Sequence, residues 1–201
     1  MKSIRISLYS IIGSAAVMAA ASAAEIGKPA PDFSATDAKG ASVSLAGLKG
    51  KVVVLEWINF GCPFVKKHYD SGNMQKLQKT YADKGVVWVT VNSGSKASGT
   101  YLEPAGFLKK ADEKKSGASH LVIDESGAVG KAFGAKVTPH VFIVDSNGVL
   151  VYDGAVDSIK STDPADVEKA VNHVAKALDA LLDGKAVEKA KTEPYGCGVK
   201  Y

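Results

Sequence analysis

The sequence predicts an α/β domain with a mixed central sheet and flanking helices, and three observations lead to this fold class. An apolar run at 52–57, interrupted only by Glu56, is typical of a strand that is covered on both faces. A helical segment follows, and a second apolar run at 86–91 completes a strand-helix-strand unit. Asn147-Gly148 separates two later apolar segments, and this pair favours a tight hairpin. The sheet is therefore expected to end in an antiparallel edge.

The remaining elements follow from helical and strand periodicity between glycine and proline breaks. In chain order they are a helix from Pro63 that is interrupted at 71–73 and ends at Gly85, a helix over 104–115, a strand over 120–123, a helix over 129–133, and hairpin strands over 141–144 and 149–152. A last long helix is predicted from Asp163-Pro164 to Gly184, with Asp163 as its N-cap. Its buried stripe is expected to contain Val167, Val171, Val174, Leu178 and Leu181.

The first residues have the pattern of a secretory signal peptide. Lys2 and Arg5 precede an apolar stretch over 6–21, and small residues follow up to Ala24. We expect cleavage near Ala23 or Ala24 and a periplasmic or secreted protein. We expect no stable membrane insertion after cleavage, because no later segment is long and apolar enough to span a bilayer. An uncleaved anchor is the alternative. The predicted organisation is a signal peptide at 1–24, a domain at 25–183 and a tail at 184–201.

The charge of the chain argues against a nucleic-acid partner. The formal net charge is +4, and it falls to +2 without residues 1–24, which contain Lys2 and Arg5 and no acidic residue. Arg5 is the only arginine, so the remaining chain has no guanidinium to recognise phosphates or guanine. We expect no nucleic-acid binding.

Cys62 is the residue that points most directly to chemistry. It follows the strand and Gly61 and precedes Pro63, which suits the first position of a helix. The free N–H groups and the positive dipole end of a helix N-terminus favour a thiolate over a thiol. The other interpretation is a small buried cysteine that only packs.

The second cysteine, Cys197, lies between two glycines in the tail. In an oxidising compartment two cysteines can form a disulfide. Cys197 then either resolves an oxidised Cys62 or forms a permanent structural bond with it, and Cys62 acting alone is a third possibility. Glu56 is also unusual, because it is a carboxylate within the apolar strand. If it is buried, its pKa should be raised and it could relay protons; at a sheet edge it would be solvated.

Three segments resemble the thioredoxin-like superfamily, and within it the redoxin or AhpC/TSA branch that is related to the peroxiredoxins. They are the opening Gly27-Lys28-Pro29-Ala30-Pro31-Asp32-Phe33, the strand-Cys-Pro-helix segment around Cys62, and Val137-Thr138-Pro139. The resemblance covers residues 25–183 and implies a thioredoxin-like fold. It also implies that Pro139 is cis and faces Cys62, and that the backbone before Pro139 pairs with an extended substrate. His140 follows Pro139 and could approach the thiolate; the alternative is an ordinary surface or packing histidine.

The chain departs from both catalytic patterns that it resembles. Thioredoxins carry a second cysteine three residues after the first, where this chain has Val65. Peroxiredoxins place proline and threonine or serine where this chain has Leu55 and Asn59. The chain is most similar to a peroxiredoxin-like group with a lone Cys-Pro-Phe-Val-Lys and a terminal Gly-Cys-x-x-Lys.

These observations predict an exported thiol-disulfide oxidoreductase without a cofactor, acting on protein or small-molecule thiols and disulfides. The candidate catalytic residues are Cys62, Cys197, Glu56 and Pro139, and the candidate substrate-binding residues are Pro63, Thr138 and His140. One alternative is an antioxidant thiol peroxidase whose substrate is a peroxide. Others are a non-catalytic protein with a structural disulfide, and a copper or zinc protein that uses Cys62, His68 and His140.

Overall fold

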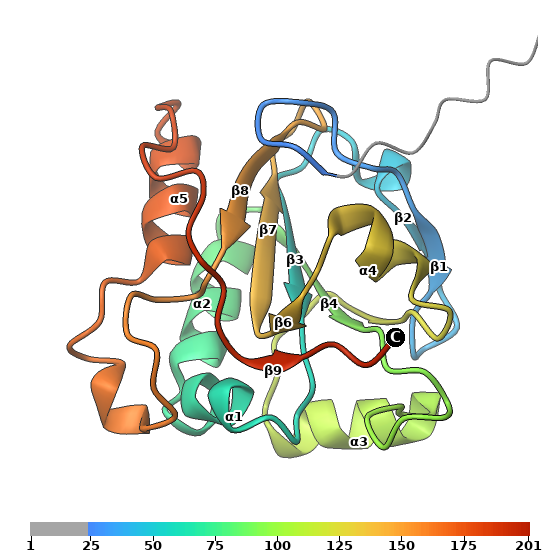
Figure 1. The fold of residues 1–201 in the computed structure, drawn as a ribbon. Helices are drawn as coiled ribbons and strands as arrows, with labels where there is room; N and C mark the ends of the chain where they lie inside the picture. Colours follow the sequence, from blue (N-terminus) through green and yellow to red (C-terminus); the bar gives the residue numbers. More distant parts are fainter. Residues whose placement is uncertain (1–23) are drawn as a thin grey trace, which may run out of the picture.

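A five-stranded mixed sheet in the order β5-β4-β3-β7-β8 forms the centre of the structure, a computed structural model that describes residues 24–201 (Figure 1). The predicted signal peptide lies outside the described residues, except for Ala24. The strands are β3 (Val53–Trp57), β4 (Val87–Asn92), β5 (His120–Ile123), β7 (His140–Val144) and β8 (Leu150–Gly154). β3, β4 and β5 are parallel, whereas β7 is antiparallel to both β3 and β8. The predicted fold class is confirmed.

Strand β3 lies in the middle of this sheet, and all five of its residues are buried. The predicted strand at 52–57 is confirmed to within one residue. Its antiparallel pairing with β7 places Trp57 opposite His140. The end of β3 and the start of β7 therefore meet at the same end of the sheet. Cys62 follows β3 there, and Pro139 directly precedes β7.

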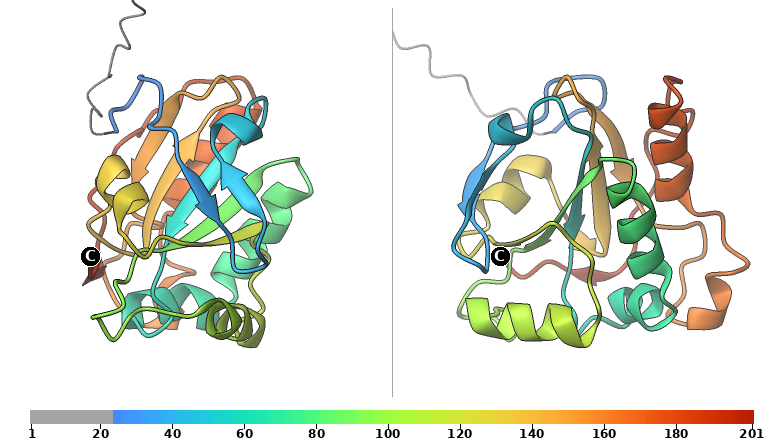
Figure 2. Two further views of the ribbon diagram at one scale, coloured as in Figure 1. Left: turned by 90° about the vertical axis from the view of Figure 1, so that its right-hand side faces the viewer. Right: turned by 180° about the vertical axis from the view of Figure 1, so that it is seen from behind.

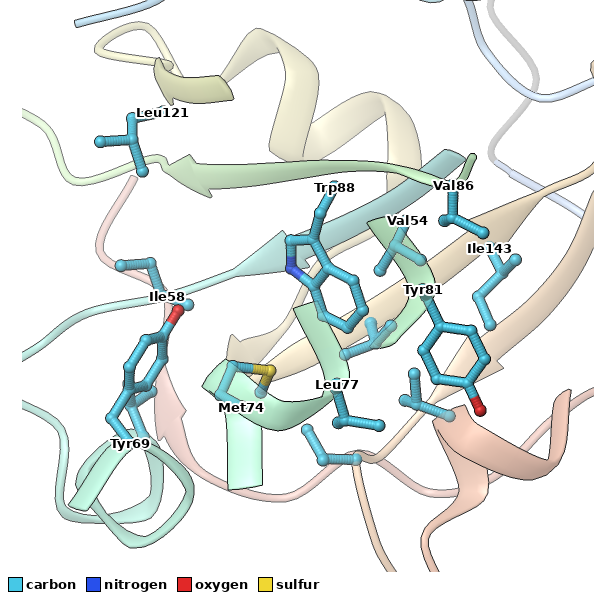
Figure 3. Close-up of a cluster of buried hydrophobic side chains, with 14 of the residues drawn as sticks. Val54, Ile58, Tyr69, Met74, Leu77, Tyr81, Val86, Trp88, Leu121 and Ile143 are labelled. Atoms are coloured by element: carbon cyan, nitrogen blue, oxygen red, sulfur yellow. The ribbon is translucent and has the colours of Figure 1, made fainter. Parts of the chain in front are cut away.

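Helices cover both faces of the sheet. On one face lie α1 (Pro63–Asp70), α2 (Asn73–Ala82) and α5 (His173–Leu182), and on the other lie α4 (Ala128–Phe133) and the hairpin β1 (Ser34–Thr36) with β2 (Ser42–Ser44) (Figures 1 and 2). α3 (Pro104–Glu113) crosses below the sheet. Two apolar cores result, and Trp88, Met74 and Leu77 belong to the one under α1 and α2 (Figure 3). The predicted helix interruption is confirmed, since α1 and α2 are separated at Gly72, which has a φ of +75°.

The predicted last long helix is wrong. The chain forms a single 3₁₀ turn, η2 (Pro164–Asp166), and α5 begins only after Asn172. The side chain of Asn172 accepts a hydrogen bond from the Ala175 amide at 2.9 Å and caps α5. The amide of Val171 donates to the Ser158 hydroxyl, and 41% of Val171 is exposed. Local side-chain hydrogen bonds thus outweigh the apolar periodicity that favoured a continuous helix.

Residues 190–201, which we call the strap, run back across the molecule. The amide of Asp153 in β8 donates to the Ala190 carbonyl at 2.9 Å, so the strap first follows the edge of the sheet. Its two-residue strand β9 (Cys197–Gly198) then pairs antiparallel with β6 (Val137–Thr138), as the dark red strand of Figure 1 shows. Within the described residues, no helix has both the length and the apolar character needed to cross a membrane.

Candidate active site

Cys62 occupies the N-cap position of α1, directly before Pro63 at the first helical position. The strand-Gly-Cys-Pro order therefore places the thiol where the sequence predicted it. Cys62 is nevertheless only 2% exposed, because the strap lies over it. The Cys62 thiol is therefore both close to the positive end of the α1 dipole and shielded from solvent by the strap.

Cys197 is the nearest reactive group to Cys62. The two Sγ atoms lie 2.7 Å apart, although 135 positions separate the residues in the sequence. The structure records both as free thiols, and a disulfide requires a separation of about 2.05 Å. The pairing of β9 with β6, in which Cys197 lies opposite Thr138, brings the two sulfur atoms together.

The two thiols have opposite pKa shifts. Burial alone would raise the pKa of Cys62, but hydrogen bonds from the side chains of Cys197 and Thr138 to the thiolate outweigh this effect and lower the pKa below its usual value. Burial and the neighbouring Cys62 sulfur raise the pKa of Cys197 to about 11. The thiolate form is therefore favoured more strongly at Cys62 than at Cys197.

The segment Thr138-Pro139 forms the second wall of the site. Its peptide bond is cis, as the family resemblance implied. The Cys62 thiol donates to the Thr138 carbonyl oxygen at 3.0 Å. A Cβ atom at Gly196 would overlap this same carbonyl, so only glycine allows the strap to approach so closely.

Glu56 is fully buried in the middle of the sheet, so the alternative of a solvated residue at a sheet edge is wrong. Burial raises its pKa to about 7, and four hydrogen-bond donors partly offset this effect. The shortest of these bonds, at 2.8 Å, comes from the indole N–H of Trp88. The others come from the side chains of Tyr69, Gln78 and Thr90. Among the described residues, no hydrogen bond links Glu56 to Cys62.

His140 is directed away from the thiols. Its Nε2 lies 2.8 Å from an Asp153 carboxylate oxygen, and its Nδ1 accepts a hydrogen bond from the Lys136 amide. Because Nδ1 accepts, Nε2 carries the proton and donates to Asp153. The structure thus brings His140 to Asp153 and not to Cys62.

The proposed metal ligands Cys62, His68 and His140 do not come together. Over residues 24–201, no group of three or more such side chains is arranged to hold a metal ion. His68 is buried and its Nδ1 lies 2.8 Å from the Asn73 side-chain amide. Burial lowers the pKa of His68 to about 4, so its imidazole is neutral at pH 7.

Three residues that the sequence did not single out lie next to the site. Lys67 in α1 and Asp157 form a buried ion pair at 2.9 Å, and the hydroxyl of Tyr195 in the strap contacts both. Lys67 follows Lys66 in the sequence, and nothing in this pair distinguishes the buried lysine from the exposed one. The one feature of the sequence that could have drawn attention to this cluster is Tyr195, an aromatic residue two positions before Cys197.

A comparison with protein families assigns the chain to a family. A family model described as Redoxin matches residues 25–171. The chain belongs to the Redoxin family. Cys62, Thr138 and Pro139 of this redoxin lie within the matched residues, whereas Cys197 lies beyond them.

Curated relatives of this redoxin carry the name thiol-disulfide oxidoreductase ResA. The protein of Bacillus thuringiensis subsp. konkukian is 31% identical over 129 residues, which are 64% of this chain and 69% of the relative. The protein of Geobacillus kaustophilus is 30% identical over 126 residues, 63% of this chain and 67% of the relative. The predicted enzyme class, a thiol-dependent oxidoreductase, is confirmed.

Solved structures share the fold. An uncharacterized conserved protein from Geobacillus kaustophilus has a TM-score of 0.77 and 31% identity, with 88% of this chain and 92% of the other covered. A hypothetical protein from Sinorhizobium meliloti 1021 has a TM-score of 0.73 and 27% identity, with coverages of 90% and 96%. The thioredoxin domain of a thiol-disulfide oxidoreductase from Bacteroides vulgatus has a TM-score of 0.52 and 25% identity, with coverages of 72% and 96%. The predicted resemblance to thioredoxin-like proteins is therefore confirmed.

Proposed function

We propose that this redoxin is an exported thiol-disulfide oxidoreductase in which Cys62 is the nucleophile and Cys197 is the resolving cysteine. The observation that carries the proposal is the 2.7 Å separation of the two sulfur atoms. Their opposite pKa shifts assign the two roles, because the thiolate is the attacking form. Cys197 thus takes the place of the missing second cysteine at Val65.

The proposed reaction has two exchange steps. The Cys62 thiolate attacks one sulfur of a substrate disulfide, forms a mixed disulfide and releases the other substrate sulfur as a thiolate. This step removes the negative charge on Cys62 that helps to raise the pKa of Cys197. Cys197 then loses its proton and attacks the Cys62 sulfur, so that the second substrate thiolate leaves and a Cys62–Cys197 disulfide remains. The substrate gains two electrons, and an external thiol reductant restores the pair.

The other candidate residues have supporting roles in this proposal. Thr138 and cis-Pro139 form the backbone wall beside Cys62. β9 pairs with Thr138 in this structure, so an extended disulfide-containing segment would contact this wall after displacing β9. Pro63 fixes the start of α1 directly after Cys62. Burial raises the pKa of Glu56 to about 7, so we propose that it exchanges protons near neutral pH, although no hydrogen bond among residues 24–201 joins it directly to either cysteine. His140 is proposed to contact substrate only through its backbone, since its ring is bound to Asp153.

Disulfide exchange is favoured over peroxide reduction. The peroxidatic residues expected at Leu55 and Asn59 are absent, and the curated relatives are named thiol-disulfide oxidoreductases. Export to the periplasm or the medium is supported by the Lys2, Arg5 and apolar pattern of the first 24 residues.

A redox titration tests the proposal. The purified protein is equilibrated in glutathione buffers, its thiols are trapped by alkylation, and the Cys62–Cys197 bond is measured by peptide mass. A reversible bond with a potential of about −120 to −270 mV, and loss of insulin reduction in Cys62→Ser, would support a catalytic pair. A bond that resists reduction below about −300 mV would indicate the structural alternative. Retention of activity in Cys62→Ser would refute the proposed mechanism.

A further inference from the structure

The position of Cys197 is not fixed by strand pairing alone. β9 and β6 contribute only two register pairs, Val137 with Gly198 and Thr138 with Cys197. A slip of one residue moves a strand by about 3.3 Å and turns each side chain to the opposite face. Such a slip would carry the Cys197 sulfur away from Cys62. Contacts outside β9 therefore help to hold the register of the strap. After β9, the Val199 amide donates to the Lys136 carbonyl at 3.0 Å.

A buried charge cluster lies directly before β9. Lys67 is 0% exposed and Asp157 3%, and the Lys67 ammonium lies 2.9 and 3.2 Å from the two Asp157 carboxylate oxygens. The same ammonium donates to the Ile159 carbonyl at 2.7 Å and contacts the Tyr195 hydroxyl at 3.1 Å. The Tyr195 hydroxyl in turn donates to Asp157.

This cluster connects the helix of one cysteine to the strand of the other. Lys67 lies in α1, whose N-cap is Cys62, and Tyr195 lies two residues before Cys197. The Tyr195 ring also packs edge-on against Phe64, with 5.8 Å between the ring centroids. A buried ion pair adds little stability compared with apolar packing of the same volume, and specifying register is the best-attested use of such groups.

We infer that Tyr195 is a positioning residue, held by the Lys67–Asp157 pair, that sets the register of the strap so that Cys197 meets Cys62. This inference rests on the proposed resolving role of Cys197 and extends it to residues that touch neither sulfur. The ring of Tyr195 packs against Phe64, whereas its hydroxyl can reach the Lys67–Asp157 pair in only one register of the strap.

The test is the equilibrium between the purified protein and glutathione, in which oxidised glutathione takes up two electrons and two protons from Cys62 and Cys197. Tyr195→Phe removes only the hydroxyl and keeps the ring against Phe64. We expect the equilibrium constant for the intramolecular disulfide to fall by about tenfold, the factor for losing one hydrogen bond to a charged group. The matched control is Tyr81→Phe, whose hydroxyl also contacts a carboxylate, that of Asp179, but lies away from the strap. Its constant should equal that of the wild type.

The possible outcomes separate the two proposals. A wild-type protein that forms no Cys62–Cys197 disulfide would refute the resolving role itself. A wild-type disulfide whose equilibrium constant is unchanged in Tyr195→Phe would overturn only the positioning role of Tyr195. A double replacement, Lys67→Met with Asp157→Leu, removes both charges together and should lower the constant as well; an unchanged constant there would also overturn the inference.

Discussion

Gly196 packs directly on the carbonyl of Thr138, the same group that accepts the hydrogen bond from the Cys62 thiol. The strap and the thiol thus meet on a single peptide group. Cys62 is only 2% exposed, and the tail segment that carries Cys197 is part of its cover. Any change that lifts the strap should therefore alter the reactivity of Cys62 and its pairing with Cys197 together.

Gly196→Ala should lift the strap, because the added methyl group overlaps the Thr138 carbonyl. We expect alkylation of Cys62 by iodoacetamide to become faster and the yield of the Cys62–Cys197 disulfide to fall. Gly198→Ala is the control, since a Cβ there has no neighbour within 4 Å. Equal alkylation rates in the two variants would show that the strap does not shield Cys62.

Replacement of Cys197 should separate its hydrogen bond from its redox role. Cys197→Ala removes a donor to Cys62, so the pKa of Cys62 should rise above its wild-type value. Cys197→Ser keeps a donor and should leave the pKa of Cys62 closer to that of the wild type. The ultraviolet absorbance of the thiolate during a pH titration measures both. Identical titrations of the two variants would contradict the role of the hydrogen bond.

Glu56 should make the stability of the fold depend on pH. Its pKa is about 7 in the folded protein and near the ordinary value of 4.5 when unfolded, so the folded state binds more protons between these values. The free energy of unfolding should therefore decrease as the pH rises from about 4.5 to 7, by up to about 3 kcal/mol for the full shift.

Glu56→Gln removes this ionisation. At low pH the free energies of unfolding of the variant and the wild type should differ by a constant amount. As the pH rises, the free energy of unfolding should fall in the wild type but not in the variant. Urea unfolding at several pH values measures the difference. A difference that stays constant with pH would mean that Glu56 does not titrate in this range.

Asn172 should be needed for the start of α5. Asn172→Ala removes the hydrogen bond to the Ala175 amide, and loss of such a cap costs about 1 kcal/mol. Asp163→Ala, which removes the equivalent bond to Ala165 at the exposed 3₁₀ turn η2, should cost less because no α-helix follows it directly. The midpoints of urea unfolding compare the two. A larger loss in Asp163→Ala would support the continuous helix that the periodicity predicted.

Local signals made the central strands and the placement of Cys62 predictable. The strand, Gly61 and Pro63 all lie within a few residues of the thiol, and helix-terminus chemistry depends on that neighbourhood alone. The burial of Glu56 could not be predicted, because the sequence of an apolar strand does not show whether another strand pairs with it on each side. The sheet order, with β3 in the middle, decides the question.

Long-range contacts could not be predicted in the same way. The sequence suggested that the tail could reach the site, but it contained no sign of the pairing between Thr138 and Cys197. The sequence around Lys67 does not reveal that its side chain is buried, because that burial depends on Asp157, 90 positions away. The predicted burial of Val171 in a long helix was wrong for a local reason. Its apolar side chain fits a helical period, but hydrogen bonds of Asn172 and Ser158 interrupt the helix there.

The distance between the two cysteines along the chain couples electron transfer to folding. A bond between sulfurs 135 positions apart would close a very long loop, and in the chain-entropy model this lowers the entropy of the unfolded chain by an amount worth about 4 to 5 kcal/mol. Oxidation of the pair should then raise the melting temperature of the whole protein. By the same linkage, conditions that weaken the fold should make the bond easier to reduce, so the reduction potential reports the stability of the entire domain and not of a short local motif.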